Sequence, residues 1–290
     1  MWFFYASFFA LWNSVSILLT KKLTTKFSPL PLLFALNVFS VLSIFLLLVL
    51  TKGFPHVTSN FFKFMFISAA LDAVAFLAAI NAIKISQISL IAPLSSFGPV
   101  FTTIIAVFTL GEIPSKIKFV GILLTVCGAY ILNVKDVKNG ILTPFKILVK
   151  NKGALLYLVA TLLWAITPIF QKKAIFETSP TIPLFASFFG FIFVTIFISP
   201  FALRSAKQIY KAIRPDIKIF TAFGIFTALS QLAAYTAFSL THVGYVTAIM
   251  RMSSLFTIVL GGKFLAEERV HERFVGAIVM LIGTIMIVLI

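Results

Sequence analysis

Residues 71–112 read LDAVAFLAAINAIKISQISLIAPLSSFGPVFTTIIAVFTLGE: two apolar runs, a polar break at 84–87 and a closing carboxylate, Glu112. Each run is long enough to cross a membrane core of about 30 Å as a helix, which rises about 1.5 Å per residue. The segment recurs 158 positions later, with identities at Leu71 and Leu229, Ala75 and Ala233, Ala79 and Ala237, Ile91 and Ile249, Ser95 and Ser253, and Ser96 and Ser254. The chain is therefore a tandem duplication.

The composition is that of an integral membrane protein. Apolar residues make up 60% of the 290 residues, with 35 Phe and a mean hydropathy of +1.10, far above the values of soluble domains. The net charge of +16 comes from Lys and Arg in short breaks between apolar runs, which argues against a nucleic-acid surface. The single Cys127 lies inside an apolar run and excludes a disulfide within the chain.

Apolar runs of about 19 residues or more define the expected fold, because a lipid-exposed backbone must satisfy its own hydrogen bonds. The sequence predicts an all-α integral membrane protein with two five-helix units, 1–134 and 153–290, joined by a basic linker at 135–152. Residues 2–20 are interpreted as the first span and not as a signal peptide, since no basic residue precedes them. The predicted spans are 2–20, 30–50, 61–83, 86–110, 117–134, 153–174, 182–203, 218–240, 243–265 and 272–290.

The duplication extends over both units, with matches at a shift of 152 (Tyr5 and Tyr157, Leu11 and Leu163, Trp12 and Trp164, Lys21 and Lys173, Pro31 and Pro183, Phe39 and Phe191). Because five spans is an odd number, the second unit enters the membrane from the opposite side, which predicts an inverted repeat. Such repeats place the functional cavity between the halves, near the midplane. A duplication that serves stability alone is the alternative.

The tight turn into a Pro-bearing fourth helix, the pair Gly111-Glu112 that closes it, and the opening Phe119-Val120-Gly121 of the fifth helix are repeated by Glu267-Glu268 and Phe274-Val275-Gly276. This pattern resembles the EamA-type drug/metabolite transporter superfamily. The resemblance implies a secondary transporter with alternating access, often an exporter of amino acids, metabolites or drugs, in the plasma membrane. It names no substrate.

Loop charge predicts the orientation. The connections after odd-numbered spans hold 17 of the 24 Lys and Arg residues, those after even-numbered spans hold 6, and Arg251 is the other one. The positive-inside rule therefore places the odd loops in the cytoplasm and both termini outside, whereas the family resemblance implies termini inside. We follow the charges of this sequence.

The connection 204–218 has a pattern of its own. Arg204, Lys207, Lys211 and Arg214 form one helical stripe, with apolar residues largely on the other side. This spacing is typical of a short helix on an anionic leaflet, so membrane lipids are one expected partner. A solvated loop that only sets the topology is the alternative.

Two charged residues, Asp72 and Arg251, lie well inside the predicted spans, where a charge costs at least ~2.5 kcal/mol. Their matched depth predicts an ion pair. One interpretation is a structural lock between helices; the other is a site for a substrate or a coupling proton. Around them lie sparse polar and aromatic side chains, which complete the candidate binding set of Trp12, Asn13, Asp72, Ser95, Ser96, Trp164, Gln231, Tyr235, Arg251 and Ser253.

The remaining features argue against catalysis. The sequence has no phosphate-binding glycine loop and no metal-ligand cluster, so we expect no enzyme activity, cofactor or metal. Glu112 ends a helix against its dipole, and a basic partner such as Lys116, Lys118 or Arg269 is expected. The leading hypothesis is an exporter of small metabolites such as amino acids or organic anions; a flippase for lipids or lipid-linked sugars and a non-transporting scaffold are the alternatives.

Overall fold

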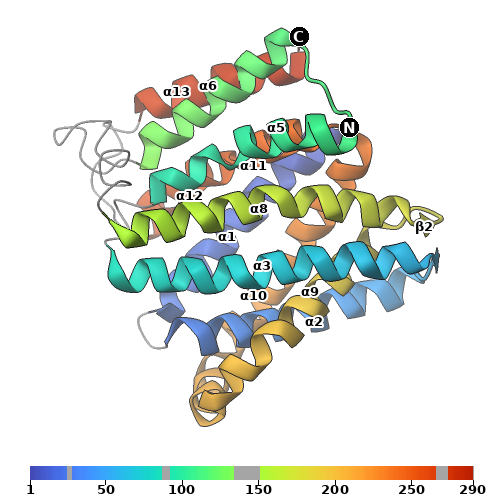
Figure 1. Ribbon diagram of the computed structural model, residues 1–290. Coiled ribbons are helices and arrows are strands. Elements are labelled where there is room, and N and C mark those ends of the chain that lie inside the picture. The colour runs from blue at the N-terminus through green and yellow to red at the C-terminus, as the bar shows by residue number, and fades with distance from the viewer. Residues whose placement is uncertain (25–27, 87–91, 134–150, 266–273, 290) are drawn as a thin grey trace.

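The computed structural model describes residues 1–24, 28–86, 92–133, 151–265 and 274–289, and it is nearly all-helical (Figure 1). The first half of the chain holds α1 (Trp2–Thr24), α2 (Pro29–Thr51), β1 (His56–Val57), α3 (Ser59–Ile85), η1 (Ala92–Phe97), α5 (Gly98–Leu110) and α6 (Lys116–Asn133). The second half holds α8 (Lys152–Phe176), β2 (Thr178–Ser179), α9 (Pro183–Ala202), η3 (Leu203–Ser205), α10 (Ala206–Leu240), α11 (Val243–Met250), α12 (Met252–Leu265) and α13 (Phe274–Leu289).

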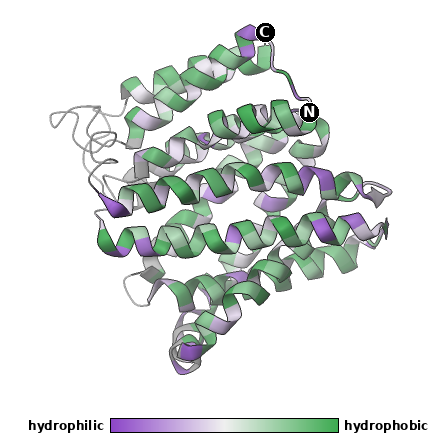
Figure 2. Ribbon diagram, viewed as in Figure 1, coloured by the Kyte–Doolittle hydropathy of each residue, from purple (hydrophilic) through white to green (hydrophobic). Residues whose placement is uncertain are grey.

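Among the described residues, 7 helical segments are long and apolar enough to cross a membrane. They correspond to the predicted spans 2–20, 30–50, 61–83, 86–110, 153–174, 182–203 and 218–240. The other three predicted spans fall on α6, on the pair α11 and α12, and on α13, which are shorter helices. Figure 2 shows the apolar colouring along the helices, with hydrophilic residues mostly near helix ends.

The helices pack mainly across the two halves of the chain. The most extensive contacts join α3 to α8, α6 to α13, α1 to both α10 and α12, and α2 to both α9 and α10. Each pair takes one helix from residues 1–134 and one from residues 151–289. The two halves are therefore interleaved, and their interface runs through the centre of the bundle (Figure 1).

Glycines allow α6 and α13 to approach at backbone distance. A Cβ on Gly121 would lie 2.8 Å from the Gly283 carbonyl oxygen, and one on Gly276 would lie 2.9 Å from that of Gly128. These residues are 7 positions apart on each helix, so they fall on one face. In a membrane the hydrophobic effect does not drive helices together, so close helix packing depends on small residues at the crossing.

The pair α3 and α8 is fastened at both ends. At one end, β1 pairs antiparallel with β2, with His56 opposite Ser179. At the other end, Ser86 donates a hydrogen bond to the Asn151 side-chain oxygen, which also caps α8 by accepting from the Gly153 amide at 2.8 Å. These connections hold the middle of α3 in a fixed place beside α8.

The spans predicted at 86–110 and 243–265 are each divided into two helical segments in the structure. In the first half a 3₁₀ segment, η1, passes into α5 at Gly98-Pro99, where proline provides no amide donor for a continuous helix. In the second half α11 ends at Met250, Arg251 is the C-cap residue, and α12 begins at Met252. No proline marks this second interruption, so the sequence did not predict it, and Arg251 keeps right-handed helical dihedral angles there (φ −63°, ψ −18°).

Candidate functional site

A cavity of about 320 Å³ lies between the two halves of the chain. Its walls come from α1, α2 and α3 of the first half and from α8 to α12 of the second, and its volume lies within the range of small-molecule sites. Most of the candidate binding residues line it: Asn13, Asp72, Trp164, Gln231, Tyr235, Arg251 and Ser253.

Three candidates lie elsewhere. Trp12 stacks on Phe226, with ring centroids 5.2 Å apart, and is not part of the cavity wall, although its repeat partner Trp164 is. Ser95 is hydrogen-bonded to the side chain of Tyr157, and Ser96 is buried. Of these two repeat-related tryptophans, Trp164 therefore lines the cavity and Trp12 does not.

The cavity also has polar residues that the sequence analysis did not select, namely Asn37, Gln171 and Thr247. Asn37 is buried in α2, and its amide nitrogen has no hydrogen-bond partner among the described residues. Asn37 and Gln171 could have been selected from the sequence, because each is an isolated amide side chain inside a predicted span. Gln231 was selected for that reason. Thr247 had no such signal, since threonine commonly bonds its own helix, and Thr247 donates to the Gly244 carbonyl.

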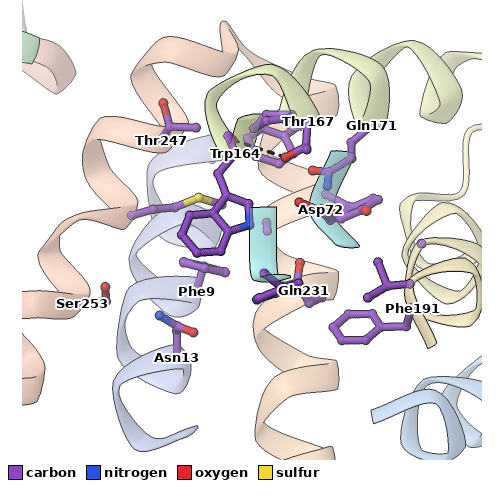
Figure 3. A pocket seen from close by; sticks show the side chains of 18 of the residues that line it. Phe9, Asn13, Asp72, Trp164, Thr167, Gln171, Phe191, Gln231, Thr247 and Ser253 are labelled. Carbon is purple, nitrogen blue, oxygen red and sulfur yellow. Dashed lines mark hydrogen bonds between the residues drawn. The ribbon is translucent and has the colours of Figure 1, made fainter. Parts of the chain in front are cut away.

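Asp72 projects into the cavity from the middle of α3. The Thr167 side chain lies within hydrogen-bonding reach of its carboxyl group. In the view of Figure 3, Asp72 is grouped with Thr167 and Gln171 on one side of the Trp164 ring, while Asn13 and Ser253 lie on the other. One part of the cavity is thus acidic and amide-rich, next to an aromatic wall.

Arg251 enters from the break between α11 and α12. A Cβ on Gly98 would lie 2.6 Å from the Nη2 atom of Arg251, so the guanidinium packs against the bare backbone at the start of α5. The Tyr157 side chain lies close enough to interact with its charge. The junction of α11 and α12 in the second half thus contributes the guanidinium, and Gly98 at the start of α5 in the first half leaves room for it.

Asp72 and Arg251 line the same cavity but form no ion pair with each other, so the expected pairing is wrong for this conformation. The reason is geometric: the arginine side chain lies against α5 and Tyr157, whereas the aspartate faces Thr167 on α8. An acidic and a basic side chain therefore line one cavity without pairing with each other.

Glu112 has a different partner from those predicted. Its Oε1 lies 2.6 Å from Lys172 Nζ of α8, and its Oε2 accepts a hydrogen bond of 2.7 Å from the Val243 amide. Lys172 also donates to the Thr241 carbonyl at 2.7 Å. Lys118 lies instead over the Tyr245 ring, and Arg269, Glu267 and Glu268 lie outside the described residues.

This Glu112–Lys172 clamp joins the end of α5 in the first half to α8 and to the start of α11 in the second. It offers no free charge, because each group has its partners. Within the ranges that the structure describes, no cluster of three or more His, Cys, Asp or Glu could hold a metal ion.

Known proteins resemble this chain in sequence pattern and in fold. The model of the EamA-like transporter family matches residues 1–134 and 151–289. A solved structure, described only as "Crystal structure of protein", superposes with a TM-score of 0.72 and 12% sequence identity, over 99% of this chain and 96% of its own. At that identity the likeness shows a shared fold and nothing more. No curated protein matches the chain.

Proposed function

Because this chain belongs to the EamA-like transporter family and is a multi-pass membrane protein, we propose that it is a secondary transporter of small metabolites that carry an anionic group, such as amino acids or organic anions. The observation that carries the proposal is the cavity between the halves, in which Arg251 and Asp72 face the same space without neutralising each other. A charge held away from water in an apolar bundle is costly, and it is typical of a substrate or ion pathway.

The proposed architecture is ten spans in two inverted units, 1–134 and 153–290. Support comes from the exchange of equivalent helices in the contacts: α3 packs on α8, and α10 packs on α1. The glycine pairs of α6 and α13 are exchanged in the same way, and both fourth helices are divided into two segments. In such transporters broken helices border a midplane site and the halves rock around it.

In the proposed mechanism Arg251 binds the anionic group of the substrate. A guanidinium offers planar, bidentate hydrogen bonds to a carboxylate and keeps its charge when buried. Asn13, Gln231 and Ser253 provide further hydrogen bonds, and Trp164 packs against the apolar part of the substrate. Asp72 serves as the site of a coupling proton.

The Glu112–Lys172 clamp holds the halves together on one side of the cavity. Alternating access requires that this side opens, so the clamp is the contact that breaks in the other state.

By the same proposal the protein is an exporter in the plasma membrane. The loop charges favour cytoplasmic odd loops. In a Cys127→Ala background, Lys207→Cys should therefore be shielded from an impermeant reagent in intact cells, and Lys118→Cys should be labelled.

The test is reconstitution into vesicles, followed by counterflow with pooled radiolabelled amino acids and organic acids. We expect counterflow of an anionic or zwitterionic compound, and no counterflow of its amide, which lacks the charge. A pH gradient should drive uptake in the wild type but not in Asp72→Asn. Equal transport of the acid and its amide would contradict the role of Arg251, and flux unaffected by pH gradients would remove the role of the proton.

The flippase is the second candidate. One observation favours it: an apolar groove lined by Val38, Leu42, Ile192 and Ile196 opens between α2 and α9. The groove is separate from the cavity, and the cavity carries both charge signs instead of the basic mouth that a phosphate headgroup requires. Scrambling of fluorescent lipids by the reconstituted protein would favour the flippase over the metabolite transporter.

A further inference from the structure

The chain turns sharply between α9 and the membrane-spanning part of α10. After η3, α10 runs from Ala206 to Pro215 and is interrupted at Asp216, whose φ of −112° and ψ of 20° are not helical. The turn lies at the lower edge of the bundle in Figure 1, where α9 and α10 meet in gold. A short helical segment, residues 206–215, is thereby set apart from the span that follows.

One face of this segment is fixed to the protein. Ile209 is buried and packs with Leu23, Leu36 and Phe220, and Ile213 packs against the same group. The segment is therefore docked on the ends of α1 and α2 and is not a solvated loop. This docking determines which of its side chains point away from the bundle.

The outward face is basic. Arg204, Lys207 and Arg214 are exposed, as is Tyr210, at 69%. None of the three basic residues makes an ion pair in the part of the chain that the structure describes. Figure 2 shows the hydrophilic residues gathered at this turn. Three exposed cations thus lie in one place.

The neighbouring residues locate this basic face at the edge of the lipid. Phe201, Leu203 and Ile217, on either side of the basic residues, are 46%, 53% and 51% exposed. Exposed apolar side chains on the flanks of a span face hydrocarbon, so the charges between them lie at the depth of the headgroups. An exposed tyrosine is also typical of that layer.

We propose that Arg204, Lys207 and Arg214 form a binding site for the phosphate-bearing headgroups of anionic phospholipids in the adjacent leaflet. The charge complementarity is direct: phosphodiesters provide anions for the exposed cations, and a docked helix presents those cations at the right depth. The odd-numbered loops, to which this segment belongs, carry most of the basic residues, which favours the anionic cytoplasmic leaflet. Each basic residue near such a surface raises lipid affinity about five-fold.

The experiment compares two triple variants of equal charge. The test variant is Arg204→Gln, Lys207→Gln, Arg214→Gln; the matched control is Lys52→Gln, Lys63→Gln, Lys84→Gln, which removes three exposed cations elsewhere. Each protein is reconstituted into nanodiscs of phosphatidylcholine and phosphatidylglycerol in equal parts, extracted, and its retained lipids are counted by native mass spectrometry. Circular dichroism and size exclusion check that each variant is folded.

We expect the wild type and the control to retain phosphatidylglycerol over phosphatidylcholine, and the test variant to lose at least about ten-fold of that preference. Added inorganic phosphate should not displace the lipid. Equal retention by the test variant and the wild type would overturn the proposal. Equal loss by both triple variants would overturn it too, because the attraction would then belong to the net charge of +16 and not to this site.

Discussion

Two sets of charges at the interface between the halves behave in opposite ways. At the clamp, Glu112 and Lys172 are 2.6 Å apart, and the Val243 amide and the Thr241 carbonyl complete their hydrogen bonds. In the cavity, Asp72 and Arg251 face the same space without forming a pair. Glu112 and Lys172 have the features of a structural contact. Asp72 and Arg251 have those of a ligand-binding site.

The difference suggests which charged residues stabilise the fold and which bind the ligand. Removing one member of a satisfied buried pair leaves the other charge without compensation, at a high cost. Removing a charged group that has no oppositely charged partner leaves no opposite charge uncompensated, so the loss should fall on binding. Four predictions test this distinction, beginning with the largest effect.

Neutralising one side of the clamp should give the largest loss of stability. Glu112→Gln and Lys172→Met should each destabilise the folded protein by about 3–5 kcal/mol, and the double variant should cost less than the sum of the two. Unfolding in detergent, followed by circular dichroism, measures this. Lys173→Met is the matched control. Lys173 is next to Lys172 in the sequence, but its side chain makes no ion pair among the described residues. Strictly additive losses at Glu112 and Lys172 would show that the clamp contributes no coupling.

Arg251→Gln should show the reverse behaviour. We expect stability to change by no more than about 1 kcal/mol, because no buried anion is stranded, while transport of an anionic substrate falls roughly ten- to hundred-fold. Asp72→Asn combined with Arg251→Gln should have additive effects on unfolding. A large loss in either single variant that the double variant recovers would mean that the two residues pair in the folded state after all.

The sequence was sufficient for the family and for several of the residues that line the cavity, because those depend on patterns that repeat along the chain. The apolar runs, the shift of 158 positions and the rare charges and amides inside spans led to Asp72, Arg251 and Gln231. Pair geometry could not be obtained in this way. Depth along a helix placed Asp72 level with Arg251, but only the bare backbone at Gly98 shows why the guanidinium lies elsewhere.

The clamp illustrates a second limit. A carboxylate at a helix end was expected to attract a basic residue close in sequence, and Lys116 and Lys118 were available. The partner is Lys172, 60 positions away, because α5 and α8 pack together. Long-range neighbours depend on how the two halves interleave, and a single sequence gives no measure of that.

Gly98→Ala should disturb the cavity although no charged residue is substituted. A Cβ would overlap the Arg251 guanidinium, so the arginine must move, and we expect affinity for the anionic substrate to fall about five-fold or more. Gly128→Ala is the control: a Cβ there would overlap the backbone of α13 at the Met280 amide, so it should lower stability and leave substrate affinity unchanged. Unchanged affinity in folded Gly98→Ala protein would mean that the position of Arg251 does not matter for binding.

The smallest effect should separate the two repeat-related tryptophans. Trp164 lines the cavity and lies edge-on to Phe76, with centroids 5.4 Å apart, whereas Trp12 stacks on Phe226 outside the wall. Trp164→Phe removes the indole N–H and part of the aromatic surface next to the ligand, so the KM of transport should rise about three-fold. Trp12→Phe keeps an aromatic stack and should leave KM unchanged, with at most a slight loss of stability. Equal changes in KM would mean that both tryptophans reach the substrate in another state of the transport cycle, and the cavity would then be as symmetric as the sequence repeat.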